Sequence, residues 1–314
     1  MIGPACLVLL AAAAAGAAAP ASARAKRAPL VQAPLSVRTN GEAFALPLMS
    51  AFVLPGEVMP LEILTPPVGV GYAVTAKDGV LEKVSATRWK WRAPETVGVY
   101  AIEIDDPARE QKAEIKAFVL VPFAQVRHGR LNGYRIGDYP APQGPAHAPP
   151  RGFVEVTSGN DETHVTPHFR LRQFLCKQES DFPKYVVLDD RLLLKLEKVL
   201  DAVKDAGHKV ETLHVMSGYR TPFYNAAIDN VKYSQHQWGT AADVFIDIDD
   251  SGTMDDLDGN KQLDKDDARV LFDLVDGLDR RKEARFVGGL GAYGGTKAHG
   301  PFVHVDVRGR TARW

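Results

Sequence analysis

A segment rich in Gly, Pro and Arg, residues 124–160, divides this chain into two stretches with different hydrophobic patterns. Its run "YPAPQGPAHAPPRG" is typical of a linker, because proline and glycine disfavour both helices and central strands. Short extended runs precede this segment, and alternating helical and extended patterns follow it. A chain of 314 residues is long enough for two domains, so we expect one domain on each side of the linker.

The first stretch, residues 41–123, predicts a series of β-strands. Its runs "AFALPLMSAFVL", "VGYAVTA", "TRWKWRAP", "GVYAIEID" and "AEIKAFVLVPF" are rich in β-branched and aromatic residues and are separated by Gly, Pro and Asp. Regular short strands without helices between them indicate a small all-β sandwich. The spacing of Trp89, Trp91 and Tyr100 resembles an immunoglobulin-like domain without its disulfide. We interpret this domain as a spacer or a binding module.

The second stretch, residues 161–314, predicts a mixed α+β domain. "TPHFRLRQFLC" begins with Thr166 as a candidate N-cap and Pro167 at the first helical position. "DDRLLLKLEKVLDAVKDAG" has the apolar spacing of an amphipathic helix that stops at Gly207. Two more helices are expected at 221–230 and 266–278, and strands at 210–216, 242–248, 286–293 and 301–309.

Residues 1–23 have the features of a secretory signal peptide. An Ala-rich apolar run ends in the small-residue pattern Ala21-Ser22-Ala23, although no Lys or Arg precedes it. We expect cleavage near Ala23, a linker over residues 24–40, and a secreted or periplasmic protein; a retained membrane anchor is the alternative. Cleavage would remove Cys6 and leave Cys176 as a small buried residue without a disulfide partner.

The charge balance gives the protein no electrostatic attraction to polyanions. Lys and Arg number 38 and Asp and Glu number 39. A nucleic-acid partner is therefore not expected, nor is binding to an anionic membrane surface. No later segment has the length and apolarity of a transmembrane span, and the oligomeric state is left open.

Three polar stretches of the second domain are candidates for a functional site: "SGYRTPFYN", "SQHQWGTAAD" and "FVHVDVRG". Each lies where a strand meets a loop, the usual position of site residues. His236, Asp243 and His304 form a donor set of the kind that holds catalytic zinc. In the last stretch, period-two alternation puts His304, Asp306 and Arg308 on one strand face. A solvated edge strand would show the same alternation.

The stretch Ser234–Asp243, written S-x-H-x-x-G-x-A-x-D, resembles the signature of the zinc D-Ala-D-Ala carboxypeptidase family, the LAS-type peptidoglycan metallopeptidases. "SGYRTPFYN" is similar to the Ser-x-x-Arg element of this family, and "FVHVDVRG" to its last ligand strand. The resemblance covers residues 161–314 and implies an α+β zinc peptidase domain of the LAS/hedgehog-like type. It also implies zinc held by His236, Asp243 and His304, with Arg220 stabilising the oxyanion of the scissile peptide.

The chain departs from the family pattern at the general base. Many members carry an acidic residue three positions before the last ligand, where this chain has Pro301, and others carry a His two positions before it, where this chain has Phe302. Asp306 is then a candidate base or an orienter of a ligand imidazole, and pairing with an arginine is its alternative role. His299, in the glycine-rich "GGTKAHG" loop, is the second candidate base.

A segment dense in Asp, residues 247–268, resembles EF-hand calcium loops. In one register Gly252 takes the turn position, and the candidate calcium ligands are Asp247, Asp249, Ser251, Asp255 and Asp258. In the overlapping register from Asp256, the glycine position holds a lysine, and the candidates are Asp256, Asp258, Asn260 and Asp267. A solvated acidic loop is the alternative, although mutual repulsion of so many carboxylates favours a bound cation.

The sequence as a whole predicts an exported zinc metallopeptidase that hydrolyses peptide bonds of peptidoglycan stem peptides, by carboxypeptidase or endopeptidase cleavage. Two alternatives remain. The protein could bind peptidoglycan without hydrolysing it, as Pro301 suggests. It could also be a calcium-dependent protein of the cell envelope in which the zinc site is vestigial.

Overall fold

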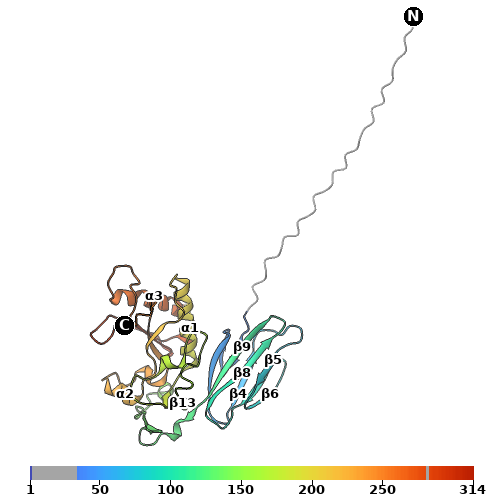
Figure 1. Cartoon of the computed structure of the whole chain (residues 1–314), viewed down its shortest axis with the longest axis horizontal. Helices are drawn as coiled ribbons and strands as arrows, with labels where there is room; N and C mark the ends of the chain where they lie inside the picture. Colours follow the sequence, from blue (N-terminus) through green and yellow to red (C-terminus); the bar gives the residue numbers. More distant parts are fainter. Residues whose placement is uncertain (2–33, 281–282) are drawn as a thin grey trace. The chain divides into compact units, whose positions relative to one another are not determined.

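The computed structural model describes Met1 and residues 34–280 and 283–314. The expected signal peptide, including Cys6, lies outside the described residues, and the account below concerns the unit formed by residues 33–314. Its architecture is mixed α+β, rich in sheet and with few helices among the described residues (Figure 1). In the described part of the chain no helix has both the length and the apolarity needed to cross a membrane.

The N-terminal part consists of two sheets. The first has the order β2-β1-β4-β7-β6, with the strands Val37–Thr39 (β1), Glu42–Phe44 (β2), Val58–Ile63 (β4), Val80–Lys83 (β6) and Arg88–Arg92 (β7). The second has the order β3-β9-β8-β5, with the strands Leu48–Val53 (β3), Ala73–Ala76 (β5), Gly98–Asp106 (β8) and Gln111–Val119 (β9). β3 runs parallel to β9, and the other pairs are antiparallel.

Alternation along the strands explains why these sheets pack face to face. In β7, Trp89 and Trp91 are buried while the Arg and Lys residues between and beside them are exposed. The Trp91 ring lies 6.4 Å from the Tyr100 ring of the second sheet. β1, β4 and β6 were not anticipated: β1 begins at Val37, inside the segment expected to be a linker, and β4 contains a proline, Pro60.

The segment 124–160 is not a simple linker, contrary to the expectation from its composition. It contains three strands: Arg130–Leu131 (β11), Tyr134–Arg135 (β12) and Gly152–Val156 (β13). β13 pairs with Lys184–Val186 (β14) and with Val121–Pro122 (β10). Short 3-10 turns occur at Phe123–Gln125 (η1) and Pro145–His147 (η2). Leu131, Tyr134 and Ile136 are buried. Apolar residues scattered among the prolines and glycines anchor this segment in the core.

A five-stranded sheet of order β15-β16-β18-β17-β19 forms the centre of the C-terminal part. Its strands are His214–Ser217 (β15), Ala241–Phe245 (β16), Gly289–Tyr293 (β17), Phe302–Asp306 (β18) and Ala312–Arg313 (β19). β19 runs parallel to β17, and the other neighbours are antiparallel. The expected pair of strands at 286–293 and 301–309 is confirmed as β17 and β18.

Two long helices, Asp190–Asp205 (α1) and Lys265–Arg280 (α3), pack against each other and beside this sheet (Figure 1). The side chain of Asp189 caps α1 by accepting the Arg191 N–H, and the chain leaves the helix through Gly207 at φ 97°. Both helices were expected. Lys195 of α1 is buried and donates to Asp279 of α3 and to the main-chain oxygen of Asp306. This lysine ties both helices to β18.

The short helix Pro222–Ala227 (α2) begins after its expected cap, Thr221, which accepts the Tyr224 N–H. The helix expected over 166–176 is wrong: only Leu171–Phe174 (η3) forms a 3-10 turn. The main-chain N–H groups of Val165 and Thr166 both bond back to the Phe169 oxygen, so a turn replaces the helix start. Cys176 is buried, as expected, and is a free thiol. The remaining 3-10 turns are Gln235–Trp238 (η4) and Ala284–Phe286 (η5).

Candidate metal centre

Three side chains expected to bind zinc meet on one face of the central sheet. Asp243 of β16 and His304 of β18 are direct cross-strand partners, and His236 reaches them from η4. Gly239 ends η4 in the left-handed conformation, at φ 65°, where a side chain would collide with the Val187 oxygen. The tight turn at this glycine lets His236 of η4 and Asp243 of β16 direct their side chains to the same place. All three side chains are buried.

The ligand atoms of the three residues are mutually close. His236 Nε2 lies 3.2 Å from Asp243 Oδ1 and 3.2 Å from His304 Nδ1, and Asp243 Oδ1 lies 2.9 Å from His304 Nδ1. In each imidazole the outer nitrogen, which points away from the cluster, has its own acceptor: His236 Nδ1 donates to the Gly218 oxygen at 2.7 Å, and His304 Nε2 donates to Asp306 at 3.1 Å. In these tautomers the inner nitrogens, His236 Nε2 and His304 Nδ1, carry lone pairs that face the cluster.

Two imidazole lone pairs and a carboxylate oxygen therefore face one another. Such atoms repel unless a cation or a proton lies between them. Nitrogen and carboxylate ligands in this number suit a zinc site that keeps a further position for water or substrate. The donor set fits the metal that the resemblance implies, and it does not by itself discriminate zinc from other divalent metals.

The electrostatics of the cluster favour a neutral His236 and an ionised Asp243, whereas the two neighbouring carboxylates favour a proton on His304. Burial lowers the pKa of His236, which makes its neutral form the stable one. Burial would raise the pKa of Asp243, but His236 and His304 outweigh burial and hold it well below its usual range. Burial also opposes the charged form of His304, yet hydrogen bonds to Asp243 and Asp306 raise its pKa. Asp243 is thus an ionised carboxylate within the core.

Arg220 contacts the metal-site carboxylate directly. Its guanidinium donates to Asp243 Oδ2, the oxygen that does not face His304, and its Nε donates to Ser217 Oγ at 2.8 Å. Its backbone N–H also bonds to the oxygen of His236. Arg220 therefore orients Asp243 and brings a positive charge to the edge of the cluster, where the resemblance expects it.

Asp306 lies on the far side of the His304 ring. Besides His304 Nε2, its carboxylate accepts the N–H groups of Gly289 and Arg308 and the Arg308 guanidinium, with Nε at 2.7 Å. Burial would raise its pKa, but His304 and Arg308 keep it well below the usual range. A fully bonded carboxylate behind a ligand is an orienter of that ligand. This geometry argues against Asp306 as the general base.

His299 is not brought to the cluster. Its imidazole lies against the Gly300 oxygen at 2.9 Å and against the Phe302 ring at 5.0 Å. Pro301 is buried just before β18 and supplies no titratable group. Neither candidate base is therefore a free carboxylate or imidazole beside the three donors: Asp306 is bonded to His304 and Arg308, and His299 to the Gly300 oxygen.

Two residues beside the cluster, Gly291 and Trp314, were missed by the sequence patterns. Gly291 occupies the same cross-strand row as Asp243, His304 and Ser217, the serine of the Ser-x-x-Arg element, and Trp314 lies over Gly291. The Trp314 ring is 5.3 Å from the His304 ring. A single glycine or tryptophan carries no sequence signal of its own here, because only the pairing of strands brings it to the site.

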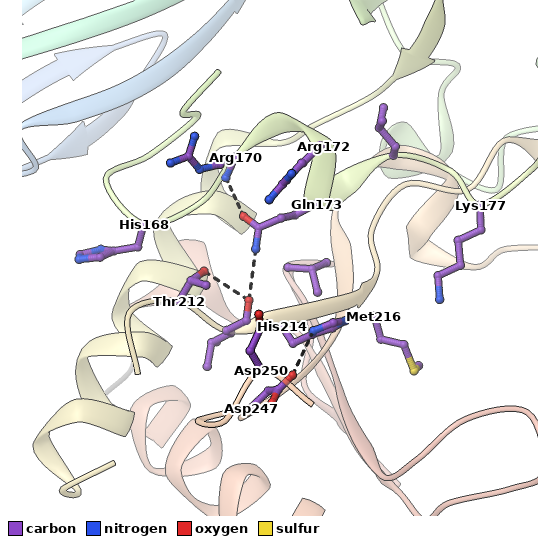
Figure 2. A pocket seen from close by; sticks show the side chains of 13 residues that line it. His168, Arg170, Arg172, Gln173, Lys177, Thr212, His214, Met216, Asp247 and Asp250 are labelled. Carbon is purple, nitrogen blue, oxygen red and sulfur yellow. Dashed lines mark hydrogen bonds and ion pairs between the residues drawn. The ribbon is translucent and has the colours of Figure 1, made fainter. Parts of the chain in front are cut away.

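A hollow of about 510 Å³ lies along β15, shown in Figure 2. Figure 2 labels a mixed lining in which basic side chains, among them Lys177 and His214, lie with the carboxylates Asp247 and Asp250. Here His214 faces Asp247, with 3.6 Å between Nδ1 and the carboxylate. Lys177 feels the charges of both Arg220 and Asp243, and burial and Arg220 lower its pKa. Neither Arg220 nor any of the three candidate metal ligands lines this hollow.

The acidic segment forms two clusters. Asp247, Asp249 and Asp255 share one, and Asp256, Asp258 and Asp267 share the other. Asp258 thus belongs to the second register and not, as expected, to the first. In the second cluster Lys261 occupies the glycine position with φ 67°, the left-handed conformation that this position demands. Ser251 donates to Asp247 through its main chain at 2.9 Å.

No model of a known protein family matches the sequence, and no curated protein matches it at a significant level.

Proposed function

We propose that this protein is an exported zinc metallopeptidase of the LAS type that hydrolyses peptide bonds in peptidoglycan stem peptides. The observation that carries the proposal is the meeting of three buried lone-pair donors, from His236, Asp243 and His304, around one point. Bound zinc would supply an activated water and a Lewis acid for the scissile carbonyl. The resemblance of "SQHQWGTAAD" to the family signature supplies the substrate class.

The chain's own residues have separate tasks in this proposal. Gly218 and Asp306 hold the proton on the outer nitrogen of each histidine, which keeps the inner nitrogens free to ligate. Arg220 orients Asp243 and offers positive charge to the oxygen that becomes negative in the transition state. The backbone turn at Gly239 fixes the approach of His236.

A non-catalytic peptidoglycan-binding protein is the second candidate. Pro301 occupies the position of the family's general base, Asp306 is committed to His304, and His299 contacts Phe302 instead of the ligands. In that case the three donors would hold a metal, and the protein would bind a stem peptide without cleaving it. The calcium-dependent alternative has as its support the two acidic clusters at residues 247–267.

Incubation of the purified protein with peptidoglycan fragments, followed by mass spectrometry of the products, tests the proposal. Zinc-dependent loss of a terminal residue or cleavage of a cross-link is expected, and a chelator should abolish it. His236→Ala should be inactive, whereas His208→Ala, a histidine remote in sequence from all ligands, should behave like the wild type. Fragments that bind but remain intact would favour the second candidate.

A further inference from the structure

Gly291 leaves a gap in the row of side chains that carries the metal ligands. Gly291 of β17 is the direct cross-strand partner of His304 in β18. Side chains at such paired positions stand about 5 Å apart on the same face of a sheet. A residue other than glycine at 291 would therefore place its side chain next to the His304 imidazole.

The indole of Trp314 fills this gap. A Cβ built on Gly291 would overlap the Trp314 indole at its nitrogen. The indole lies beside the His304 ring, with 5.3 Å between ring centroids and 41° between planes. Its N–H donates to the Tyr293 hydroxyl, and the Arg308 guanidinium lies over it at 5.4 Å. The tryptophan thus replaces the missing cross-strand neighbour of the ligand.

The backbone holds the indole in this position. Trp314 N–H donates to the Leu290 oxygen at 3.3 Å, and its oxygen accepts the Ala292 N–H at 3.1 Å. The preceding residue, Arg313, binds Asp276 and Asp279 of α3 at 2.8 Å each. The main-chain N–H and oxygen of Trp314 are therefore both bonded to β17, and the preceding residue is bonded to α3.

His304 is consequently clamped from two directions. Asp306 fixes its outer nitrogen by a hydrogen bond, and Trp314 restricts the plane of its ring by contact. A ligand whose ring is held in its binding orientation loses less conformational freedom on metal binding. The indole is 44 % exposed, so its position is not explained by the needs of the hydrophobic core.

We propose that Trp314 is a positioning residue of the metal centre, which holds the imidazole of His304 in the orientation that binds the metal. The inference rests on the metal centre of the proposed function, but it concerns metal affinity and not turnover. Trp314 does not ligate the metal. Its effect passes through His304.

Zinc affinity, measured by competition with a chromophoric chelator, tests this proposal. Trp314→Ala should bind zinc roughly tenfold more weakly than the wild type, the lower end of the range for loss of a residue that supports a ligand. Trp314→Phe keeps a ring in the gap and should recover most of that loss. Gly291→Ala keeps the tryptophan but pushes the indole away, so it should weaken zinc binding as Trp314→Ala does.

The Co²⁺-substituted protein provides a second readout, because its visible spectrum reports ligand geometry. The spectrum should change in Trp314→Ala and Gly291→Ala and stay unchanged in Phe182→Ala, which removes an aromatic side chain of similar exposure, 41 %. Melting of the metal-free proteins shows whether each variant is folded. Wild-type zinc affinity and an unchanged Co²⁺ spectrum in folded Trp314→Ala and Gly291→Ala would overturn the inference. A wild type that binds no zinc would overturn the proposed function as well.

Discussion

Asp243 and His304 are opposite each other on neighbouring antiparallel strands, and Asp243 Oδ1 lies 2.9 Å from His304 Nδ1. Residues that are far apart in sequence thus become the two fixed corners of the candidate metal centre. Because both corners belong to the central sheet, only His236 depends on a turn for its position.

Zinc should stabilise the wild type and should not stabilise His236→Ala. A ligand that binds only the folded state raises the melting temperature by mass action. His236→Ala removes one of three donors, so neither bound zinc after dialysis nor a zinc-dependent melting shift is expected. Elemental analysis and thermal melting measure the two effects. Equal zinc content in the variant and the wild type would remove His236 from the ligand set.

Arg220→Lys should lower turnover while zinc still binds at saturation. Lysine keeps the positive charge but lacks the planar fork that reaches both Ser217 and Asp243. Loss of a donor to the developing oxyanion commonly costs about a hundredfold in kcat. Steady-state kinetics with zinc in excess give the comparison. An unchanged kcat would exclude Arg220 from the transition state.

Asp306→Asn should weaken zinc binding by about tenfold to a hundredfold, because the hydrogen bond that orients His304 is changed. If Asp306 is only an orienter, the acidic limb of the pH–rate profile measured with zinc in excess should remain where it is in the wild type. A shift or loss of that limb, with zinc affinity intact, would instead restore Asp306 as the general base.

The contribution of Asp190 to the stability of the folded protein should fall as pH rises from about 4 to about 7. Burial, Asp189 and Glu42 raise the pKa of Asp190 from 3.8 to about 7. In this window Asp190 keeps a proton in the folded protein that it releases in the unfolded chain, so its contribution to the free energy of unfolding decreases with pH and stays reduced above pH 7.

Asp190→Asn removes this titration. At pH 8 the variant should be more stable than the wild type, by at most about 4 kcal/mol, since one pKa unit corresponds to about 1.4 kcal/mol. Urea unfolding at pH 4 and pH 8 measures the difference. Parallel pH dependence of the two proteins would show that Asp190 does not titrate in this range.

Calcium in the acidic segment stays a prediction. Protein first stripped of calcium should melt at a higher temperature when millimolar Ca²⁺ is added, because bound cation would relieve repulsion among clustered carboxylates. Asp249→Asn and Asp256→Asn separate the two clusters, since each removes one charge from one of them. The same melting temperature with and without Ca²⁺ would indicate a solvated acidic loop.

Local patterns in the sequence were sufficient for the elements whose signals are short-range. The apolar spacing of α1, its end before Gly207 and the common face of His304 and Asp306 in β18 depend on neighbours within a few residues, and the structure has each of them. Local patterns failed at residues 166–176, where a helix was expected, and at residues 124–160, where a linker was expected. There a helix cap signal and a linker composition were overridden by packing, which local propensity does not contain.

The sequence by itself determined the donor types of the candidate site, because His236, Asp243 and His304 belong to short motifs that can be recognised along the chain. Only the tertiary structure decided which atoms face one another and what surrounds them. Strand register placed Gly291 beside His304 and brought Trp314 into the gap. Register is set by the packing of whole sheet faces, so no local segment of the sequence encodes it.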